Sequence, residues 1–184
     1  MKDKKEVEIR FQIDSTMEER IRSSLLQIGW VSGKIMSQTD TYFCATYYMD
    51  NKITNDCPYV VRTRESEQGS TLTYKSFQGN ADGGWVEIES AVNDISAIKD
   101  ILRNIGQVDY LLISKQRLSG TIDDVEVNID YVENLGLFVE MEVFDQDVSS
   151  GRKKLLSLVE KIGLSEKSIE TRGYVQLMEE KMKS

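Results

Sequence analysis

The sequence contains no histidine, and only two of its 184 residues are cysteines, Cys44 and Cys57. The lack of histidine excludes the Ser-His and Cys-His pairs of nucleophilic catalysis, and it excludes every metal site with a histidine ligand. Two cysteines are too few for a disulfide framework or for a structural zinc site. A metal ion bound by this chain must therefore have oxygen ligands, which favours Mg²⁺ or Mn²⁺.

Long apolar runs are missing as well, and Pro58 is the only proline. No stretch approaches the roughly 18 apolar residues of a membrane span, and no apolar run follows the N-terminal lysines as in a signal peptide. We therefore expect a cytoplasmic protein with reduced thiols and without a membrane partner. The net charge of −8 also disfavours a general nucleic-acid-binding protein, which would be basic.

The residues that are present suffice for one folded domain over residues 1–184, with 40% hydrophobic and 29% charged residues. Period-two alternation and turn signals predict eight strands, at residues 6–13, 38–48, 59–65, 70–77, 85–92, 110–118, 121–131 and 137–144. Apolar residues at helical spacing predict four helices, at residues 17–28, 95–105, 149–162 and 171–183.

The connections between the expected strands are mostly short, and we expect a tight turn at Ser119-Gly120. Short connections indicate an antiparallel sheet, which either closes into a barrel or stays open as a sandwich. The helices that begin at Met17, Ile95 and Ser149 are amphipathic. We therefore expect them to cover the outer, apolar face of the sheet.

The other face of the expected sheet is charged. In the first strand, Glu6, Glu8 and Arg10 alternate with apolar residues, so they share one face. The same alternation in later strands adds further acids, which gives the set Glu6, Glu8, Glu87, Glu89, Glu126, Asp130, Glu140 and Glu142. The bases on this face are Arg10, Arg62, Arg64, Lys75, Lys115 and Arg117.

Two interpretations of this face remain open from the pattern alone. It is either a solvated face of mixed charge, as in many antiparallel sheets, or the lining of a tunnel in a closed sheet. In a tunnel, crowded carboxylates would bind a divalent cation, and arginine and lysine side chains would bind a polyphosphate. Such a combination suits phosphoryl chemistry and needs no glycine-rich phosphate loop.

Several short motifs follow one another along the chain in a recognisable order. Glu6-Val7-Glu8-Ile9-Arg10 is similar to a Glu-x-Glu-x-Lys signature, and Gln38-Thr39-Asp40-Thr41-Tyr42-Phe43 is similar to a second-strand motif. Further matching segments are Val61-Arg62-Thr63-Arg64, Thr73-Tyr74-Lys75, Lys115-Gln116-Arg117, Ile129-Asp130, Phe138-Val139-Glu140-Met141-Glu142 and the closing Gly173-Tyr174-Val175-Gln176-Leu177-Met178. Together they resemble the CYTH superfamily, the triphosphate tunnel metalloenzymes, over nearly the whole chain, and the second motif resembles its class IV adenylate cyclase branch.

The resemblance implies a single CYTH-like domain with an α+β fold, in which an eight-stranded antiparallel β-barrel forms a triphosphate tunnel and helices pack outside. It implies that Mg²⁺ or Mn²⁺ is held by Glu6, Glu8, Asp130, Glu140 and Glu142. The substrate-binding set that it implies is Arg10, Arg62, Arg64, Lys75, Glu87, Glu89, Lys115 and Arg117. Within that set it gives catalytic roles to Arg10, Lys75 and Lys115, and it is compatible with a homodimer.

Other residues receive plainer interpretations. Asp40 is expected at a turn or at the tunnel mouth, and Tyr42 and Tyr174 are expected to be packing aromatics. Arg10 stands where the signature has a lysine, and an arginine stays protonated, so we do not expect it to accept a proton.

Three functions remain after the resemblance is taken into account. The first is a class IV adenylate cyclase-like reaction, in which the ribose 3′-hydroxyl of ATP attacks the α-phosphorus and pyrophosphate leaves. The alternative is a triphosphatase that hydrolyses inorganic triphosphate, thiamine triphosphate or a nucleoside triphosphate. The third is a polyphosphate-binding module without turnover, which is motivated by Arg10.

Overall fold

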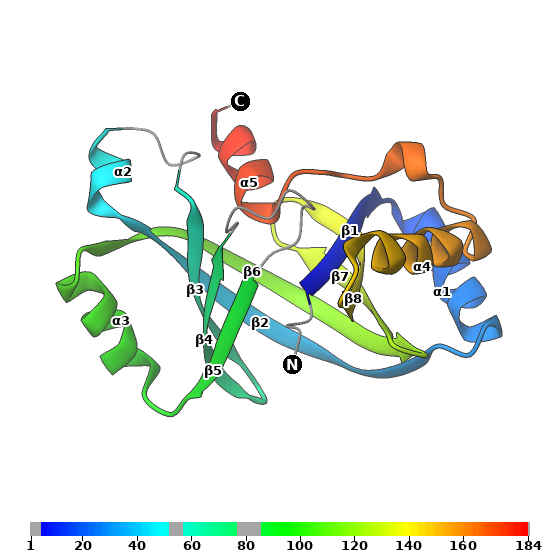
Figure 1. The fold of residues 1–184 in the computed structure, drawn as a ribbon, viewed down its shortest axis with the longest axis horizontal. Coiled ribbons are helices and arrows are strands. Elements are labelled where there is room, and N and C mark those ends of the chain that lie inside the picture. The colour runs from blue at the N-terminus through cyan, green and yellow to red at the C-terminus, as the bar shows by residue number, and fades with distance from the viewer. Residues whose placement is uncertain (1–4, 52–56, 77–85, 184) are drawn as a thin grey trace. The chain divides into compact units, whose positions relative to one another are not determined.

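The computed structural model describes residues 5–51, 57–76 and 86–183 (Figure 1). Its strands are β1 (Lys5–Ile13), β2 (Val31–Ala45), β3 (Tyr59–Ser66), β4 (Gly69–Ser76), β5 (Val86–Val92), β6 (Gln107–Ile122), β7 (Val125–Val132) and β8 (Gly136–Asp145). Its helices are α1 (Ser15–Gln27), α2 (Thr46–Asp50), α3 (Ile95–Asn104), α4 (Val148–Lys161), the 3₁₀ helix η2 (Glu166–Ser168) and α5 (Tyr174–Lys183). None of these described helices has the length and apolar composition that crossing a membrane requires.

The strands belong to one eight-stranded sheet with the order β1-β8-β7-β6-β2-β3-β4-β5. The strand ladders of this sheet are antiparallel, as the short connections predict. The chain divides into two compact units, a first unit of Met1–Met36 and Lys115–Ser184 and a second unit of Ser37–Ser114. Each unit is described by itself below, and the single domain over residues 1–184 stays a prediction.

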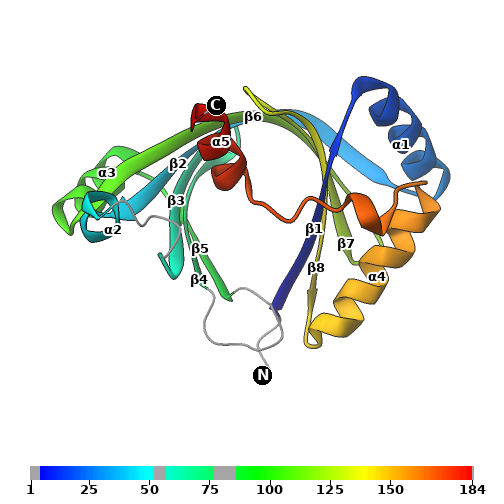
Figure 2. The same ribbon diagram turned by 90° about the horizontal axis from the view of Figure 1, so that it is seen from above.

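The core of the first unit lies between the sheet and two helices. Val7, Ile9 and Phe11 of β1 are buried with apolar residues of β7 and β8, while Ile21 of α1 and Leu155 of α4 cover them. Figure 2 shows α1 and α4 on the same side of β1 and β8. The expectation that these amphipathic helices cover the apolar face of the sheet is confirmed for this unit.

Each of these helices begins at an aspartate that caps it. The Asp14 carboxylate accepts a hydrogen bond from the Met17 backbone amide at 2.8 Å, and the Asp147 carboxylate accepts from the first amides of α4. Such a cap satisfies backbone donors that have no partner inside the helix.

The core of the second unit is smaller. Phe43 of β2, Val61 of β3 and Leu102 of α3 are buried together, with Ile98 of α3 packed against them. The Asp94 side chain caps α3 and accepts from Ala97 N at 2.9 Å. The expected cover of the sheet by this third amphipathic helix is therefore confirmed.

The predicted turn at Ser119-Gly120 is wrong. β6 continues through both residues to Ile122, and the chain turns at Asp123, whose φ of 52° lies in the left-handed region. The glycine serves a close contact instead, because a Cβ on Gly120 would lie 2.3 Å from Nε1 of the buried Trp30. Sequence pattern alone cannot distinguish these two uses of glycine.

Other boundaries differ at the ends of elements. β2 begins at Val31 rather than at residue 38 and gives way to α2 at Thr46, while α5 begins at Tyr174. The early part of β2 is missed because its side chains are mostly exposed and do not alternate. The described part of the fifth strand begins at Val86. Its expected first residue, Trp85, lies outside the described residues.

The contact between Gly120 and Trp30 predicts a position-specific cost in stability. We expect Gly120→Ala to lower the free energy of unfolding by about 1–3 kcal/mol, because the added methyl group overlaps the indole and forces it to move. Gly33→Ala is the matched control, since the nearest atom to its added Cβ is Ser119 O at 3.6 Å. Denaturant unfolding of both variants tests this, and equal midpoints for the two would contradict it.

Candidate active site

The strand register of the first unit lines up its charged side chains in rows across β1, β8, β7 and β6. Residues that are directly opposite in neighbouring strands share a face of the sheet. One row is Arg10, Glu140, Asn128 and Ser119. The row on one side of it is Glu8, Glu142, Glu126 and Thr121, and the row on the other side is Gln12, Phe138, Asp130 and Arg117. We call these twelve positions the first-unit charged face.

Asp130 is fully buried and is bound by cations on several sides. Arg117 donates to it from Nε at 2.7 Å and from Nη2 at 2.5 Å, and Lys115 Nζ lies 3.2 Å away. The Tyr174 hydroxyl donates to the same carboxylate at 3.0 Å. A buried carboxylate needs such compensation, because removal from water penalises its charge by several kcal/mol.

Glu140 is the second fully engaged carboxylate of this face. Its Oε1 accepts a hydrogen bond from Arg10 Nε at 2.6 Å, and its Oε2 accepts one from Arg117 Nη2. Burial would raise the pKa of Glu140, but the charges of Arg10 and Arg117 hold that pKa well below its usual value. Glu140 is therefore ionised at any pH at which the protein works.

Arg10 is held in the charged form by the same contacts. Burial opposes its charge, but Glu140 and then Glu8 outweigh burial and raise the pKa of the guanidinium. Its Nη2 donates to Glu8, and its Cζ lies 4.4 Å from the centre of the Tyr174 ring. A guanidinium in this setting cannot act as a base, in agreement with the interpretation of the sequence.

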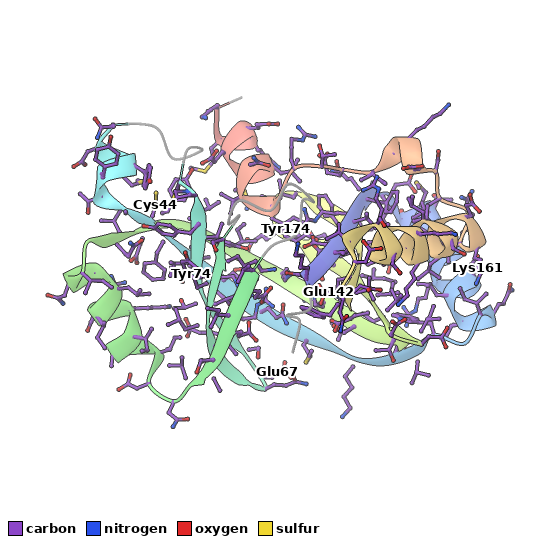
Figure 3. The ribbon with its side chains drawn as sticks, viewed as in Figure 1. Cys44, Glu67, Tyr74, Glu142, Lys161 and Tyr174 are labelled. Carbon is purple, nitrogen blue, oxygen red and sulfur yellow. The ribbon has the colours of Figure 1, made fainter. Side chains whose placement is uncertain are left out.

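In the row of Glu8, Glu142 and Glu126, the negative charge of the carboxylates is less well compensated by neighbouring cations. Burial, and then repulsion from Glu126, raise the pKa of Glu142 from its ordinary 4.5 to about 7. Figure 3 labels Glu142 on β8 and Tyr174 at the start of α5. Glu6 lies outside this row, two residues before Glu8 on β1, and is also buried. This end of the face therefore carries negative charge that a cation would relieve.

The oxygens of the first-unit charged face fit Mg²⁺ or Mn²⁺ in donor type. Within the described parts of the chain, however, no three acidic side chains converge closely enough to hold one metal ion. Asp130 and Glu140 are engaged by Arg117, so a metal ion at either would first have to displace a guanidinium. The row that contains Glu142 fits a metal ion better, because its negative charge is compensated less.

A second charged face lies on β2, β3, β4 and β5 in the second unit. Arg64 donates to both oxygens of Asp40, at 2.7 Å and 2.8 Å, and Arg62 Nη1 lies 3.8 Å from the same carboxylate. Arg62 also donates to the Thr73 hydroxyl at 3.0 Å.

The outer strands of the second unit add further charged groups to this face. The Thr73 hydroxyl donates to Glu89 at 2.7 Å, and Lys75 Nζ lies 2.6 Å from a carboxylate oxygen of Glu87. These interactions are within hydrogen-bonding distance, so the predicted phosphate-binding residues of this unit are held in place by carboxylate and hydroxyl partners.

The register thus sorts the predicted site residues onto two faces. The first-unit charged face and its margins carry Glu6, Glu8, Arg10, Lys115, Arg117, Asp130, Glu140 and Glu142. The second-unit charged face carries Arg62, Arg64, Lys75, Glu87 and Glu89.

Some site residues were not assigned from the sequence. Asp40 is not a turn residue, because it lies within β2, is 1% exposed and binds Arg64. Alternation in the Gln38–Tyr42 segment could have placed it on the charged face. Tyr174 packs edge-on against Phe138, as expected of an aromatic, but it also binds Asp130. No pattern within the sequence could have revealed that second contact.

Comparison with known proteins places this geometry in a family. The CYTH domain profile matches residues 4–174. The chain belongs to the CYTH family. A relative from Methanocaldococcus jannaschii, named "Putative adenylate cyclase", is 27% identical over 179 residues, which cover 94% of this chain and 97% of the relative.

Solved structures of other proteins share the fold. A structure from Vibrio parahaemolyticus, described as a "putative adenylate cyclase", matches with a TM-score of 0.81 and 15% identity, covering 96% of this chain and 99% of its own. A Hippeastrum protein described as a "putative adenylyl cyclase" with a dominant triphosphatase activity matches with a TM-score of 0.69 and 12% identity, covering 97% of this chain and 96% of its own. These likenesses confirm the predicted fold class, an α+β chain with an eight-stranded antiparallel sheet and helices packed against it.

The raised pKa of Glu142 predicts a pH-dependent stability of the metal-free CYTH protein. Below pH 4.5 the carboxyl group is protonated in both states, and above about 7 it is ionised in both. In between, the unfolded chain releases the proton more readily, so stability falls as the pH rises through this window. We expect Glu142→Gln to remove this fall and to stabilise the protein at pH 8 by on the order of 2 kcal/mol.

Denaturant unfolding in a chelator, at a series of pH values from about 4 to about 8, measures this effect. Glu133→Gln, at an exposed position outside both faces, is the control and should retain the slope of the parent protein. Parallel pH profiles for the parent and Glu142→Gln would show that Glu142 does not titrate in this window.

Proposed function

We propose that this CYTH protein is a divalent-metal-dependent enzyme that acts on a triphosphate, with ATP as substrate and cyclic AMP and pyrophosphate as products. The observation that carries the proposal is the buried network of Arg10, Glu140, Arg117 and Asp130 on the first-unit charged face. It places two guanidinium groups and two carboxylates in direct contact. Phosphate oxygens can bind the guanidinium groups, and a metal ion can bind the carboxylates.

The cations of both faces bind the phosphates in this proposal. Arginine suits this role because its planar fork matches two phosphate oxygens at once. Each of these cations is already held by a carboxylate or hydroxyl partner, so little side-chain freedom is lost on binding. Glu87 and Glu89 orient the cations beside them. The substrate-binding set is Arg10, Arg62, Arg64, Lys75, Glu87, Glu89, Lys115 and Arg117.

In this proposal carboxylates of the first-unit charged face and its margin would hold the metal ion, Mg²⁺ or Mn²⁺. The proposed ligands are Glu6, Glu8, Asp130, Glu140 and Glu142. When it is bound, the metal ion neutralises phosphate charge and lowers the pKa of the attacking hydroxyl group. Its preference for oxygen donors agrees with the composition of this face, on which the candidate ligands are carboxylates.

Arg10, Lys75 and Lys115 have catalytic roles as fixed positive charges. Arg10 stays protonated, so it stabilises the negative charge that develops on the departing pyrophosphate and takes no proton. Lys115 is buried beside Asp130, and Lys75 is paired with Glu87. Fixed charges of this kind need no reorganisation during the reaction, which is the reason that they lower its barrier.

Two features favour the cyclase reaction. The Gln38–Phe43 segment resembles the second-strand motif of the cyclase branch, and Asp40 and Tyr42 within it lie opposite Arg64 and Arg62. The relative from M. jannaschii, which is similar over almost its entire length, carries a cyclase name.

The alternative is a triphosphatase that hydrolyses inorganic triphosphate, thiamine triphosphate or a nucleoside triphosphate. The Hippeastrum protein, which has the same fold, is described as having a dominant triphosphatase activity. The charged faces serve both reactions, since each needs cations for the phosphates and a metal ion. A polyphosphate-binding module without turnover would need the same cations, but it would not need the carboxylates of the proposed metal site.

A product assay tests the proposal. Purified protein is incubated separately with ATP, inorganic triphosphate and thiamine triphosphate, with Mg²⁺ and then with Mn²⁺, and the products are separated by chromatography. We expect cyclic AMP and pyrophosphate from ATP. Glu140→Gln is the control for contaminating enzymes, because Glu140 is bound by both Arg10 and Arg117 and its replacement should abolish turnover.

Each of the other outcomes identifies a different function. Orthophosphate without cyclic nucleotide would replace the cyclase with the triphosphatase. Binding of the triphosphates without any product would leave only the binding module. Turnover that Glu140→Gln does not reduce would remove Glu140 from the metal site.

A substitution of Arg64 that keeps its positive charge tests substrate binding. We expect Arg64→Lys to raise KM for the triphosphate about tenfold, because a lysine retains the positive charge beside Asp40 but loses the bidentate fork. Arg103→Lys on α3 is the matched control. Arg103 makes an equally bidentate contact to Asp109, at 3.0 Å and 2.7 Å, in the same unit but on an exposed helix. Equal KM values for both variants would remove Arg64 from the substrate-binding set.

A further inference from the structure

Asn128 is a buried polar residue whose side chain has no partner. It lies in the middle of β7 and is 0% exposed. Neither its Nδ2 nor its Oδ1 makes a hydrogen bond within the described part of the protein. An unpaired buried amide costs roughly 1–3 kcal/mol, so the position needs an explanation.

The position of Asn128 indicates what its partner would be. It stands directly opposite Glu140 on β8 and belongs to the first-unit charged face. Glu126 and Asp130 are two residues away on the same strand, and side chains at this spacing point to the same side of the sheet. The amide is therefore surrounded by the carboxylates proposed to hold a metal ion.

Glu140 does not satisfy this amide, although it lies directly across the ladder. Its two oxygens are taken by Arg10 and Arg117. The diagonal neighbour of Asn128 on β8 is Glu142, which faces Glu126 across the ladder, so two acids meet on that side of the amide. The unpaired amide and the excess of negative charge thus occur next to each other on the same face.

We propose that Asn128 is a further ligand of the divalent cation, which its Oδ1 binds together with the carboxylates of Glu142 and Glu126. This inference rests on the proposed function, since it adds a neutral donor to the metal site of that proposal. Glu126, which is outside the set of ligands proposed above, joins the site because it faces Glu142 across the ladder.

A carboxamide suits this position for an electrostatic reason. Its oxygen is a hard donor of the kind that Mg²⁺ and Mn²⁺ bind, and it brings no charge. A further carboxylate in the same place would add like-charge repulsion to Glu142 and Glu126, which face each other across the ladder. An asparagine therefore adds a metal ligand, and it adds no like-charge repulsion to the metal-free protein.

The experiment compares metal affinity with the stability of the metal-free protein. In Asn128→Leu, a side chain of similar shape replaces the amide. We expect its dissociation constant for Mn²⁺, measured by isothermal titration calorimetry, to rise about tenfold. Its unfolding midpoint in a chelator should stay equal or rise, since the removed amide made no hydrogen bond. If Asn128→Leu does not fold, Asn128→Ala replaces it, with the same calorimetric result expected.

Thr63→Val is the matched control. Thr63 is also 0% exposed and its hydroxyl has no partner among the described residues, but it faces away from Arg62 and Arg64 on β3. It should leave the Mn²⁺ affinity unchanged. An unchanged affinity in Asn128→Leu combined with a lower unfolding midpoint would overturn the inference, because Asn128 would then be a structural residue that is satisfied by water.

Glu142→Gln separates the inference from the proposed function. If Glu142→Gln weakens Mn²⁺ binding and Asn128→Leu does not, only the inference about Asn128 fails. If neither substitution changes the affinity, the proposed metal site fails together with it. Weakening in both variants, with Thr63→Val unchanged, supports Asn128 as a ligand.

Discussion

The structure of the first unit depends on mutual neutralisation of buried charges. Asp130 and Glu140 are both buried, and each is bound by Arg117, while Arg10 binds Glu140 from the other side. Removing any one member would take a partner from a buried charge, which is more costly than the intact pair itself is stabilising. The pairing also specifies strand register, since a slip by one residue would bring Val139 to the charged face and Glu140 into the core.

Compensation of charge is uneven along this face. The row of Arg10 and Glu140 is neutral within itself, whereas the row of Glu8, Glu142 and Glu126 has three acids. The second row lowers the stability of the metal-free protein at neutral pH, as the raised pKa of Glu142 shows. A cost of this kind is typical of groups that are arranged for a ligand, because the ligand supplies the missing charge.

Period-two alternation predicted which strand residues lie on a charged face, because the direction of a side chain in a strand depends only on its position along that strand. Alternation could not predict contacts that depend on tertiary structure. Gly120 was assigned to a turn because its contact with Trp30 joins distant parts of the chain. Tyr174 reaches Asp130 from a helix, so strand alternation could not place it. Asn128 lies on the charged face by the same alternation, but only the contacts in the structure show that its amide has no partner.

The presence of arginine rather than lysine at position 10 has a structural explanation. Three nitrogens of the Arg10 guanidinium donate in three directions, to Glu140, to Glu8 and to the Arg172 carbonyl oxygen. The single ammonium group of a lysine could not span these acceptors, because they surround a planar fork. The contact with Arg172 fixes the segment that leads into α5, and the ring of Tyr174 at the start of that helix lies against the same guanidinium. Arg10 therefore joins β1 to the C-terminal segment, and this role requires an arginine whether or not the reaction does.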